Sequence, residues 1–325
     1  MSGFQKKTIR KILRNRIDQL IATVDDETVQ TAMKRDTLIT GGCITSMLLG
    51  EKINDFDVYF RTMETARLVA EYYVKRFNDN RTIPVGGVKY TPEVRLETRP
   101  NIKGEKENRI IIFMKSAGVA GEEQTDYHYF EHGPEDNHEE FLDTAMDIAE
   151  PSIEAVQELH QEIKEAKKKY KPVFLTDNAI SLSDKMQLII RFYGEPDEIH
   201  RNFDFIHCTG VYDYRANSVS YSPEMMESLL TKRLLYSGSL YPIASLLRIR
   251  KFINRGWSIS AGQMLKIVSQ LNRVDLGDIN ILKEQLMGVD VAYMHELISE
   301  LSKVETHTRV DETYLANLLD KIFED

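Results

Sequence analysis

The chain has little cysteine and no long apolar run. Among its 325 residues, only Cys43 and Cys208 are cysteines, and no spaced group of Cys and His residues is present. A disulfide framework or a structural zinc site is therefore not expected, which fits a reducing, cytoplasmic setting. No stretch approaches the roughly 18 apolar residues of a membrane-spanning helix. The basic N-terminus also lacks the apolar core of a signal peptide. We expect a cytoplasmic protein without a membrane segment.

Charge is distributed unevenly along the chain. The net charge is −9, but residues 121–165 contain fifteen Asp or Glu residues and one Lys. Residues 1–16 contain six Lys or Arg residues and no acid, and residues 223–273 contain eight basic residues and two acids. A basic surface suits a triphosphate or a nucleic acid. Solvent-exposed helix faces would give the same pattern, so both interpretations stay open.

The most informative stretch runs from Leu38 to Phe60. Gly41-Gly42 follows a short apolar run, an apolar helical segment spans Ile44–Leu49, and Asp55-Phe56-Asp57 opens an expected strand. Residues i and i+2 of a strand share a face, so the two Asp side chains would lie together and suit a divalent cation. The glycines let the backbone approach phosphates, and the helix after them offers N–H donors. The stretch predicts metal-dependent nucleotidyl transfer.

This pattern resembles the signature of the DNA polymerase β-like nucleotidyltransferase superfamily. The closer resemblance is to the head domain of class II CCA-adding enzymes and bacterial poly(A) polymerases. It rests on Gly41-Gly42, Leu48-Leu49-Gly50 and Asp55-Phe56-Asp57. The Arg-Asp pair usual before Leu-Leu-Gly is replaced by Thr45-Ser46. The resemblance implies two Mg²⁺ ions held by Asp55 and Asp57, an NTP substrate (ATP or CTP), and phosphates near Gly41, Gly42 and Ser46.

A third carboxylate lies on a later strand in the families that the chain resembles. The candidate is Asp204, which stands between Phe203 and Phe205 in a segment expected to form a strand through Cys208. A buried acid at this position would need a cation to neutralise it. The alternative is an edge strand on which Asp204 faces water.

The segment Leu229–Ile259 resembles the helical neck that follows the head domain in class II enzymes. Its counterparts are Leu246-Leu247-Arg248, Lys251-Phe252 and Arg255-Gly256-Trp257, whereas the Glu-Asp-x-x-Arg element that selects C and A is absent from Leu240–Ala244. Arg248 and Lys251 lie three residues apart on one helix face, as a triphosphate clamp requires. An ordinary helical bundle is the alternative.

Together, periodicity, chain breakers and the resemblance predict an α+β protein. We expect a mixed sheet of the nucleotidyltransferase fold with flanking helices and an insertion, followed by a mainly helical C-terminal domain. The expected domains are N-terminal helices (1–36), a nucleotidyltransferase domain (37–222, with an insertion at about 80–185) and a helical domain (223–325). Expected elements are helices at 4–23, 26–35, Met63–Phe77 and Phe141–Lys169, strands at Phe174–Ser183, Gln187–Phe192 and Phe203–Cys208, a hairpin of Tyr90–Arg99 with Arg109–Lys115, and a loop at 121–140.

The predicted activity is transfer of NMP from an NTP to an acceptor hydroxyl with release of pyrophosphate. The resemblance and the basic helical region favour an RNA or tRNA 3′ end as the acceptor. The long insertion is unusual for a plain CCA-adding enzyme, so a protein or small-molecule hydroxyl is the alternative acceptor. A third hypothesis, of another class, is a non-catalytic nucleotide- or RNA-binding relative.

Overall fold

The computed structural model describes residues 3–79, 89–100, 106–117, 169–176 and 178–278, together with 281, 282, 285, 313, 316 and 317. The chain forms two compact units. Unit 1 comprises Met1–Pro196 and Gly210–Ser220, and unit 2 comprises Asp197–Thr209 and Tyr221–Asp325. The acidic segment 121–165, with the loop predicted at 121–140, lies outside the described residues, as does the helix predicted over 141–169 except for Lys169.

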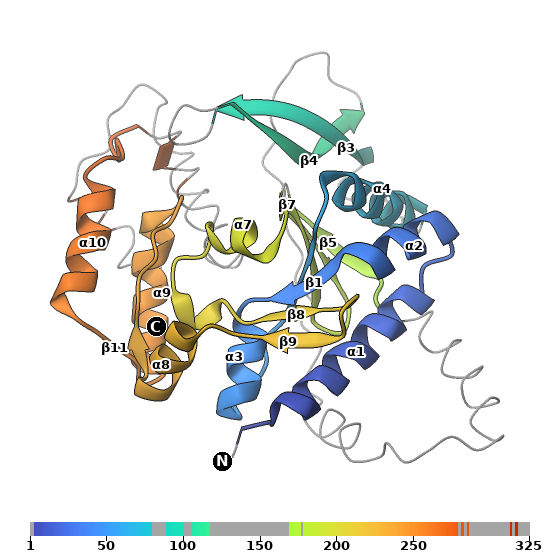
Figure 1. Cartoon of the computed structure of the whole chain (residues 1–325). Coiled ribbons are helices and arrows are strands. Elements are labelled where there is room, and N and C mark those ends of the chain that lie inside the picture. Colours follow the sequence, from blue (N-terminus) through green and yellow to red (C-terminus); the bar gives the residue numbers. More distant parts are fainter. Residues whose placement is uncertain are drawn as a thin grey trace. The chain divides into compact units, whose positions relative to one another are not determined.

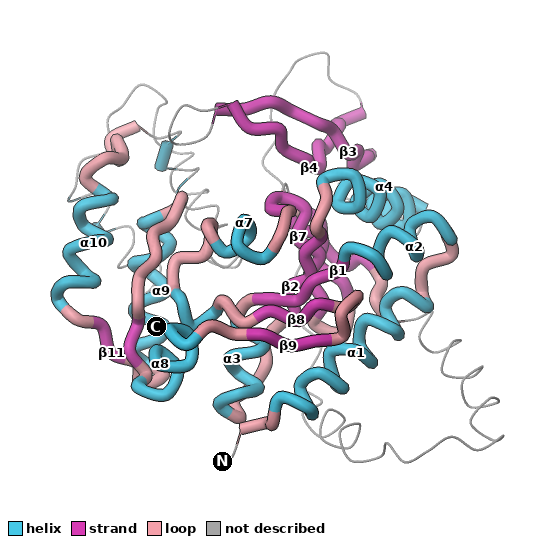
Figure 2. Tube along the Cα trace, in the orientation of Figure 1, coloured by secondary structure: helices cyan, strands magenta, loops and turns pink. Residues whose placement is uncertain are grey.

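Unit 1 is built around a seven-stranded mixed sheet with the order β5-β6-β7-β2-β1-β8-β9 (Figures 1 and 2). β2 and β7 run parallel, and each of the other neighbouring pairs is antiparallel. The strands are β1 (Thr37–Thr40), β2 (Phe56–Phe60), β5 (Pro172–Leu175), β6 (Ala179–Leu182), β7 (Met186–Tyr193), β8 (Val211–Asp213) and β9 (Ser218–Ser220).

The described helices of unit 1 connect and support this sheet through their buried side chains. In α1 the side chains of Ile9, Leu13, Ile17 and Leu20 are fully buried. The carboxylate of Asp26 caps α2 by accepting hydrogen bonds from the backbone N–H groups of Thr28 and Val29. The helices are α1 (Lys6–Ala22), α2 (Glu27–Asp36), α3 (Gly42–Leu49) and α4 (Met63–Asp79). They confirm the helices predicted at 4–23, 26–35 and 63–77.

A separate two-stranded hairpin confirms the one predicted near residue 100. β3 (Lys89–Pro100) pairs antiparallel with β4 (Lys106–Ala117), and its Cα partners run from Lys89 opposite Ala117 to Pro100 opposite Lys106. The single strand predicted over Phe174–Ser183 is wrong in one respect, because β5 and β6 divide it. The Thr176 hydroxyl accepts hydrogen bonds from the backbone N–H groups of Asn178 and Ala179, which closes a turn between the two strands.

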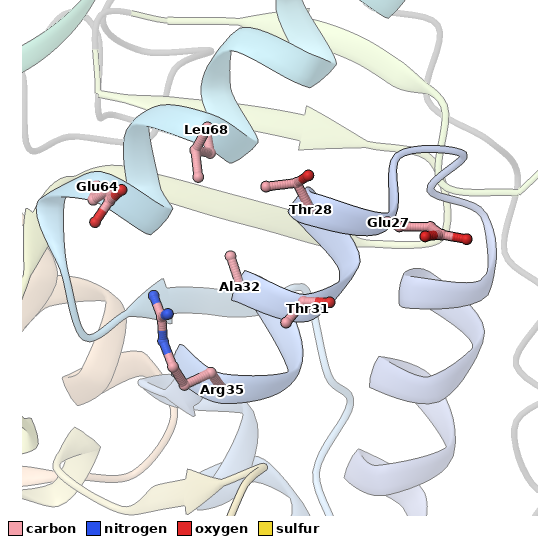
Figure 3. A pocket seen from close by; sticks show the side chains of 7 residues that line it. All are labelled: Glu27, Thr28, Thr31, Ala32, Arg35, Glu64 and Leu68. Carbon is pink, nitrogen blue, oxygen red and sulfur yellow. The ribbon is translucent and has the colours of Figure 1, made fainter.

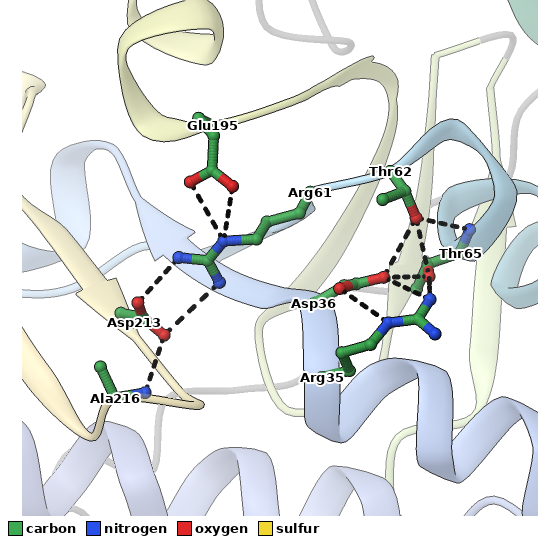
Figure 4. A network of polar contacts seen from close by, with 8 residues as sticks. All are labelled: Arg35, Asp36, Arg61, Thr62, Thr65, Glu195, Asp213 and Ala216. Atoms are coloured by element: carbon green, nitrogen blue, oxygen red, sulfur yellow. Dashed lines mark hydrogen bonds and ion pairs between the residues drawn. The ribbon is translucent and has the colours of Figure 1, made fainter.

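Two ionic clusters, each centred on a buried side chain, stabilise the C-terminal end of β2 in unit 1 (Figure 4). The Arg61 guanidinium, only 8% exposed, donates to the carboxylates of Asp213 (2.7 Å) and Glu195 (3.1 Å). Burial opposes ionisation of Asp36, but hydrogen bonds from Arg35, Thr65 and Thr62 outweigh it and hold the pKa of that carboxyl below its ordinary value. These contacts connect β2 to β8 and to the first turn of α4.

Unit 2 is mainly helical, as predicted from residue 223 onward. Trp257 is buried and lies in a cluster with His207, Phe205 and Phe252. Two short strands run parallel to each other in this unit. Its elements are α7 (Pro196–His200), α8 (Pro223–Thr231), β10 (Arg233–Leu234), α9 (Pro242–Asn254), β11 (Ser258–Ile259) and α10 (Ala261–Leu271).

The strand predicted over Phe203–Cys208 is wrong. Phe205 makes one isolated antiparallel bridge with Tyr236, and Ile206–Cys208 forms a turn of 3₁₀ helix. This segment was expected to complete the sheet, but β8, which lies shortly after it in the chain, pairs with β1. Otherwise the predicted α+β class, a mixed sheet with flanking helices, is confirmed. Within the described part of the chain, no helix is both long and apolar enough to cross a membrane.

Candidate active site

The two predicted metal ligands lie at the start of β2 in unit 1. The strand begins at Phe56, so Asp57 is its second residue and Asp55 lies one position before it. Asp55 is exposed and Asp57 is half-buried, while Phe56 and Val58 are buried in the core. The predicted alternation of polar and apolar side chains is therefore present at this strand end. It leaves carboxylate oxygens at the surface of the sheet, where they can reach a ligand.

Gly41 lies directly against the Asp57 carboxylate. Its φ of +108° is in a region that residues with a side chain rarely adopt. A Cβ atom at this position would lie 2.8 Å from Asp57 Oδ2, which is closer than a van der Waals contact allows. Both the backbone angle and the close approach therefore require glycine. This contact places the carboxylate beside the N-terminus of α3, whose partial positive charge favours an anion.

Gly42 differs from its neighbour. It is the first residue of α3, it is exposed, and a Cβ atom built on it would meet no atom within 4 Å. The N-terminus of α3 is therefore open to a ligand on the Gly42 side, while Gly41 faces Asp57. The predicted phosphate contact Ser46 lies one helical turn beyond Gly42 on the same helix face. Ser46 is 7% exposed, so little of its hydroxyl side reaches the surface.

A neighbour of Asp57 that the sequence did not reveal is Gln187 of β7. The two residues are Cα partners in the parallel pairing of β2 with β7. Partners in register on adjacent strands project to the same face of a sheet, so the side chains of Gln187 and Asp57 leave the sheet on one face. Ser181 of β6, the partner of Gln187 on the next strand, extends this row. A strand was predicted to begin at Gln187, but no local pattern indicates which strand it pairs with.

Asp204 lies in unit 2, where a cation already neutralises it. Its side chain is 12% exposed, and the Arg248 guanidinium donates a hydrogen bond of 2.5 Å to Asp204 Oδ2. The carbonyl of Asp204 accepts hydrogen bonds from the backbone N–H and the hydroxyl of Ser237. A buried Asp204 was expected to need a cation to neutralise its charge, and the Arg248 guanidinium supplies one. Its role as a third metal ligand stays a prediction.

The two residues of the predicted triphosphate clamp on α9 have different surroundings. Arg248 is 38% exposed and engages Asp204, whereas Lys251, one turn later, is exposed.

The imidazole of His207 is fully buried beside the rings of Phe252 and Trp257, at centroid distances of 4.5 and 4.3 Å. Burial lowers the pKa of His207 to about 4. This imidazole therefore stays neutral at physiological pH.

Two other features bear on the site. A hollow of about 420 Å³ between α2 and α4 has a mixed polar and apolar lining and contains none of the predicted site residues (Figure 3). It is lined by Glu27, Thr28, Thr31, Ala32, Arg35, Glu64 and Leu68. Across the described residues, no three His, Cys, Asp or Glu side chains come close enough to hold a metal ion. Asp55 and Asp57 would therefore share a bound ion with oxygens from a substrate, as Mg²⁺ sites with one or two carboxylates do.

Sequence comparison places much of this chain in one family. A family model described as "Gad2: Gabija anti-defense 2 family protein" matches residues 11–232, which is more than half of the chain. A curated relative from Bacillus phage SPbetaL7, named "Gabija anti-defense 2", is 26% identical over 107 residues. That alignment covers 32% of this chain and 27% of the relative.

Some solved structures show a low likeness to this chain. The Thermotoga maritima CCA-adding enzyme complexed with tRNA is 11% identical with a TM-score of 0.35, and the alignment covers 88% of this chain and 53% of that one. A tRNA-processing enzyme with CTP is 12% identical with a TM-score of 0.34, over 90% of this chain and 69% of that one. The Bacillus stearothermophilus CCA-adding enzyme in complex with CTP is 8% identical with a TM-score of 0.31, over 86% and 51%. TM-scores of this size do not establish a shared activity.

Proposed function

The chain belongs to the Gabija anti-defense 2 family, and we propose that it is a metal-dependent nucleotidyltransferase. It would move NMP from an NTP to an acceptor hydroxyl and release pyrophosphate. The observation that carries the proposal is the contact between Gly41 and Asp57 at the N-terminus of α3. A glycine turn, a helix N-terminus and a carboxylate pair are thereby placed together in one unit. Each supplies one requirement of phosphoryl transfer chemistry.

The residues of unit 1 have distinct tasks in this proposal. Asp55 and Asp57 would hold Mg²⁺ through carboxylate oxygens, which are the ligands that this ion prefers. The chemistry that Mg²⁺ supplies at such a site is electrostatic stabilisation of the entering and leaving oxygens, and two ions are used where both oxygens are held. The exposed Gly42 would place backbone N–H groups of α3 next to phosphate oxygens of the NTP. Gly41 positions Asp57 and keeps its carboxylate at the helix terminus.

The reaction balances with these groups and one base. A bond forms between the acceptor oxygen and the α-phosphorus, and the bond from the α-phosphorus to the α,β-bridging oxygen breaks. The electron pair of that bond leaves with pyrophosphate, and the proton of the acceptor hydroxyl passes to a general base. Asp204 is the predicted base and third carboxylate. In unit 2, Arg248 and Lys251 are the residues predicted to contact the triphosphate.

We take the 3′ end of an RNA, tRNA above all, as the acceptor, and ATP or CTP as the donor. Six basic residues and no acid within residues 1–16 support a polyanionic acceptor. A hydroxyl on a protein or a small molecule is the second candidate. It is favoured by the family description, because an anti-defense protein could act by modifying a component of the opposing system.

The test is incubation of the purified protein with Mg²⁺ and each α-³²P-labelled NTP, with and without total tRNA. Denaturing gels would separate labelled RNA from labelled protein, and a coupled assay would measure pyrophosphate. We expect label on RNA with one or two of the four NTPs. Label on protein, or pyrophosphate without labelled RNA, would move the acceptor to the second candidate. Absence of any NTP turnover with RNA, protein and cell extract supplied as acceptors would contradict the transferase itself.

A further inference from the structure

Helix α1 of unit 1 has one buried face and one basic face. The side chains of Ile9, Leu13, Ile17 and Leu20 are fully buried. On the opposite face Lys7, Arg10 and Lys11 are exposed. Their spacing of three and four residues places the three cations on one side of the helix, next to each other. We call these three residues the α1 basic face.

A shallow hollow of about 300 Å³ adjoins the α1 basic face. Its floor contains one acid, Asp18, whose carboxylate accepts hydrogen bonds from Arg14 Nε (3.1 Å) and from the Tyr214 hydroxyl (2.5 Å). Asp18 is therefore occupied by neighbours inside the unit. Asn15 and Asn217 add amide donors to the same hollow. The lining is Lys7, Arg10, Lys11, Arg14, Asn15, Asp18 and Asn217.

The charges of the α1 basic face are not used within the described structure. In the parts of the chain that the structure describes, Lys7, Arg10 and Lys11 form no salt bridge, whereas Arg14 pairs with Asp18. Three exposed cations around a polar hollow create a local positive potential that attracts polyanions. Among the described residues, no acid forms a salt bridge with these three cations, so an external anion is a group that this potential fits.

α1 is attached to both elements that carry the candidate active site in unit 1. The backbone N–H of Phe4, just before α1, donates to the Met47 carbonyl of α3 at 2.8 Å. Further along α1, the Arg16 guanidinium lies over the Phe56 ring, 4.2 Å from its centroid. Phe56 stands between Asp55 and Asp57. The α1 basic face is therefore held in a constant relation to the carboxylate pair by contacts within one unit.

We propose that the α1 basic face binds the phosphate backbone of a single-stranded RNA acceptor and guides its 3′ end toward the carboxylate pair. This inference rests on the proposed function, because it assigns a surface to the acceptor of that reaction. A membrane is not the partner that the helix fits, since a helix lying on a lipid surface inserts its apolar face. Here that face is buried in the core of unit 1. A strand of phosphates matches a row of cations beside amide donors.

The test is fluorescence anisotropy with a labelled single-stranded oligoribonucleotide in EDTA, over a series of salt concentrations. The double variant Lys7→Gln with Lys11→Gln removes two charges from the α1 basic face. Its matched control is Lys34→Gln with Lys75→Gln, which removes two exposed lysines from α2 and α4 of the same unit. For two phosphate contacts to a single strand, the slope of log affinity against log salt should fall by about 1.4, with affinity down on the order of tenfold at low salt. The control should match the wild type.

Several results would overturn the proposal. Equal weakening by both double variants would mean that only net charge matters, and no weakening by either would remove the α1 basic face from RNA binding. Binding of the wild type to phosphatidylserine vesicles but not to RNA would assign the surface to lipid. Equal affinity for a DNA strand of the same sequence would keep the phosphate contact but remove the preference for RNA. Because the assay contains no metal or NTP, intact RNA binding by a wild type that transfers no NMP would count against the proposed function alone.

The kinetic consequence separates guiding from catalysis. The Lys7→Gln, Lys11→Gln variant should raise the KM for RNA about tenfold and leave kcat unchanged, because these residues hold the acceptor and touch no reacting atom. A fall in kcat with unchanged KM would contradict a guiding role.

Discussion

Asp57 in unit 1 and Asp204 in unit 2 are both acids next to phenylalanine in the sequence, yet their surroundings differ. Asp57 lies in a strand, against the Gly41 backbone at a helix N-terminus and on the same sheet face as Gln187. Asp204 lies before a 3₁₀ turn, and Arg248 donates a hydrogen bond to it. Asp204 therefore has a guanidinium of the same unit as its counter-charge, whereas Asp57 lies where the partial positive charge of a helix N-terminus favours an anion. The comparison teaches that neighbours in space, more than neighbours in sequence, decide what an acid can do.

The largest expected effect is on the Asp57 side of this comparison. Asp57→Asn should lower NMP transfer by about a thousandfold or more, which corresponds to about 4 kcal/mol of lost transition-state stabilisation. The substitution keeps the shape of the side chain and removes its charge, so the thermal unfolding midpoint should stay within a few degrees. Asp79→Asn, an exposed acid at the end of α4, is the matched control and should keep full activity. Full activity of Asp57→Asn would show that the candidate site is wrong.

The Asp204 side is tested by breaking its ion pair from either end. Asp204→Asn removes the predicted third carboxylate and should lower kcat about a hundredfold. Arg248→Gln breaks the same ion pair but keeps the carboxylate, so it should chiefly raise the KM for NTP. Both variants should lose about 1–2 kcal/mol of unfolding free energy, because each leaves one partner without its hydrogen bond. If both keep the wild-type kcat, Asp204 is a structural partner of Arg248 and takes no part in transfer.

The two neighbouring glycines offer a comparison within unit 1. Gly41→Ala should lower transfer on the order of a hundredfold and cost about 1–3 kcal/mol, because the new methyl group meets Asp57 Oδ2 and the backbone has a positive φ. Gly42→Ala has open space around it and should keep the fold as stable as the wild type. If the NTP phosphates approach Gly42, the KM of the Gly42→Ala variant for NTP should rise severalfold. Equal loss of stability in both variants, measured by denaturant unfolding, would contradict this division of roles.

The last prediction concerns acid, and it separates the two units. Burial lowers the pKa of His207 in unit 2 to about 4, from 6.5 in an unfolded chain. Between these values the unfolded state binds more protons than the folded state, so the unfolding free energy falls as pH falls from 6.5 to 4. The shift corresponds to about 3 kcal/mol, lost over that window. Trp257 is the only tryptophan and lies beside His207, so its fluorescence reports unit 2.

The control for this pH dependence is His207→Leu, in which the loss between pH 6.5 and 4 should disappear. An unchanged slope in that variant would assign the effect to another group. Unit 1 should behave differently, because the buried Asp36 and the half-buried Asp213 have lowered pKa values. Their stabilising contribution is present above their unfolded pKa and is lost only as pH falls through the folded pKa, below about 4. Circular dichroism should therefore show unit 2 losing stability first on acidification.

Much of the local structure could be predicted because it depends on residues close together in the chain. The apolar spacing of α1 and α4 and the run from Gly41 to Phe60 each produced the expected elements. At Thr176 the local pattern fails to predict the structure, because its hydroxyl closes a turn inside a segment whose sequence predicts one strand. The strand expected at Phe203 failed because apolar alternation also suits a buried turn, and β8 pairs with the edge of β1 instead.

The sequence by itself determined the local elements and the pairing of a glycine turn with two acids, because glycine conformations and side-chain alternation are properties of neighbouring residues. Tertiary structure alone decided three things: the closeness of Gly41 to Asp57, the pairing of Gln187 with Asp57 across β7 and β2, and the Arg248 partner of Asp204. Each is a contact between residues far apart in the chain. Such contacts follow from strand register and helix packing, which minimise buried charge and exposed apolar surface over a whole unit.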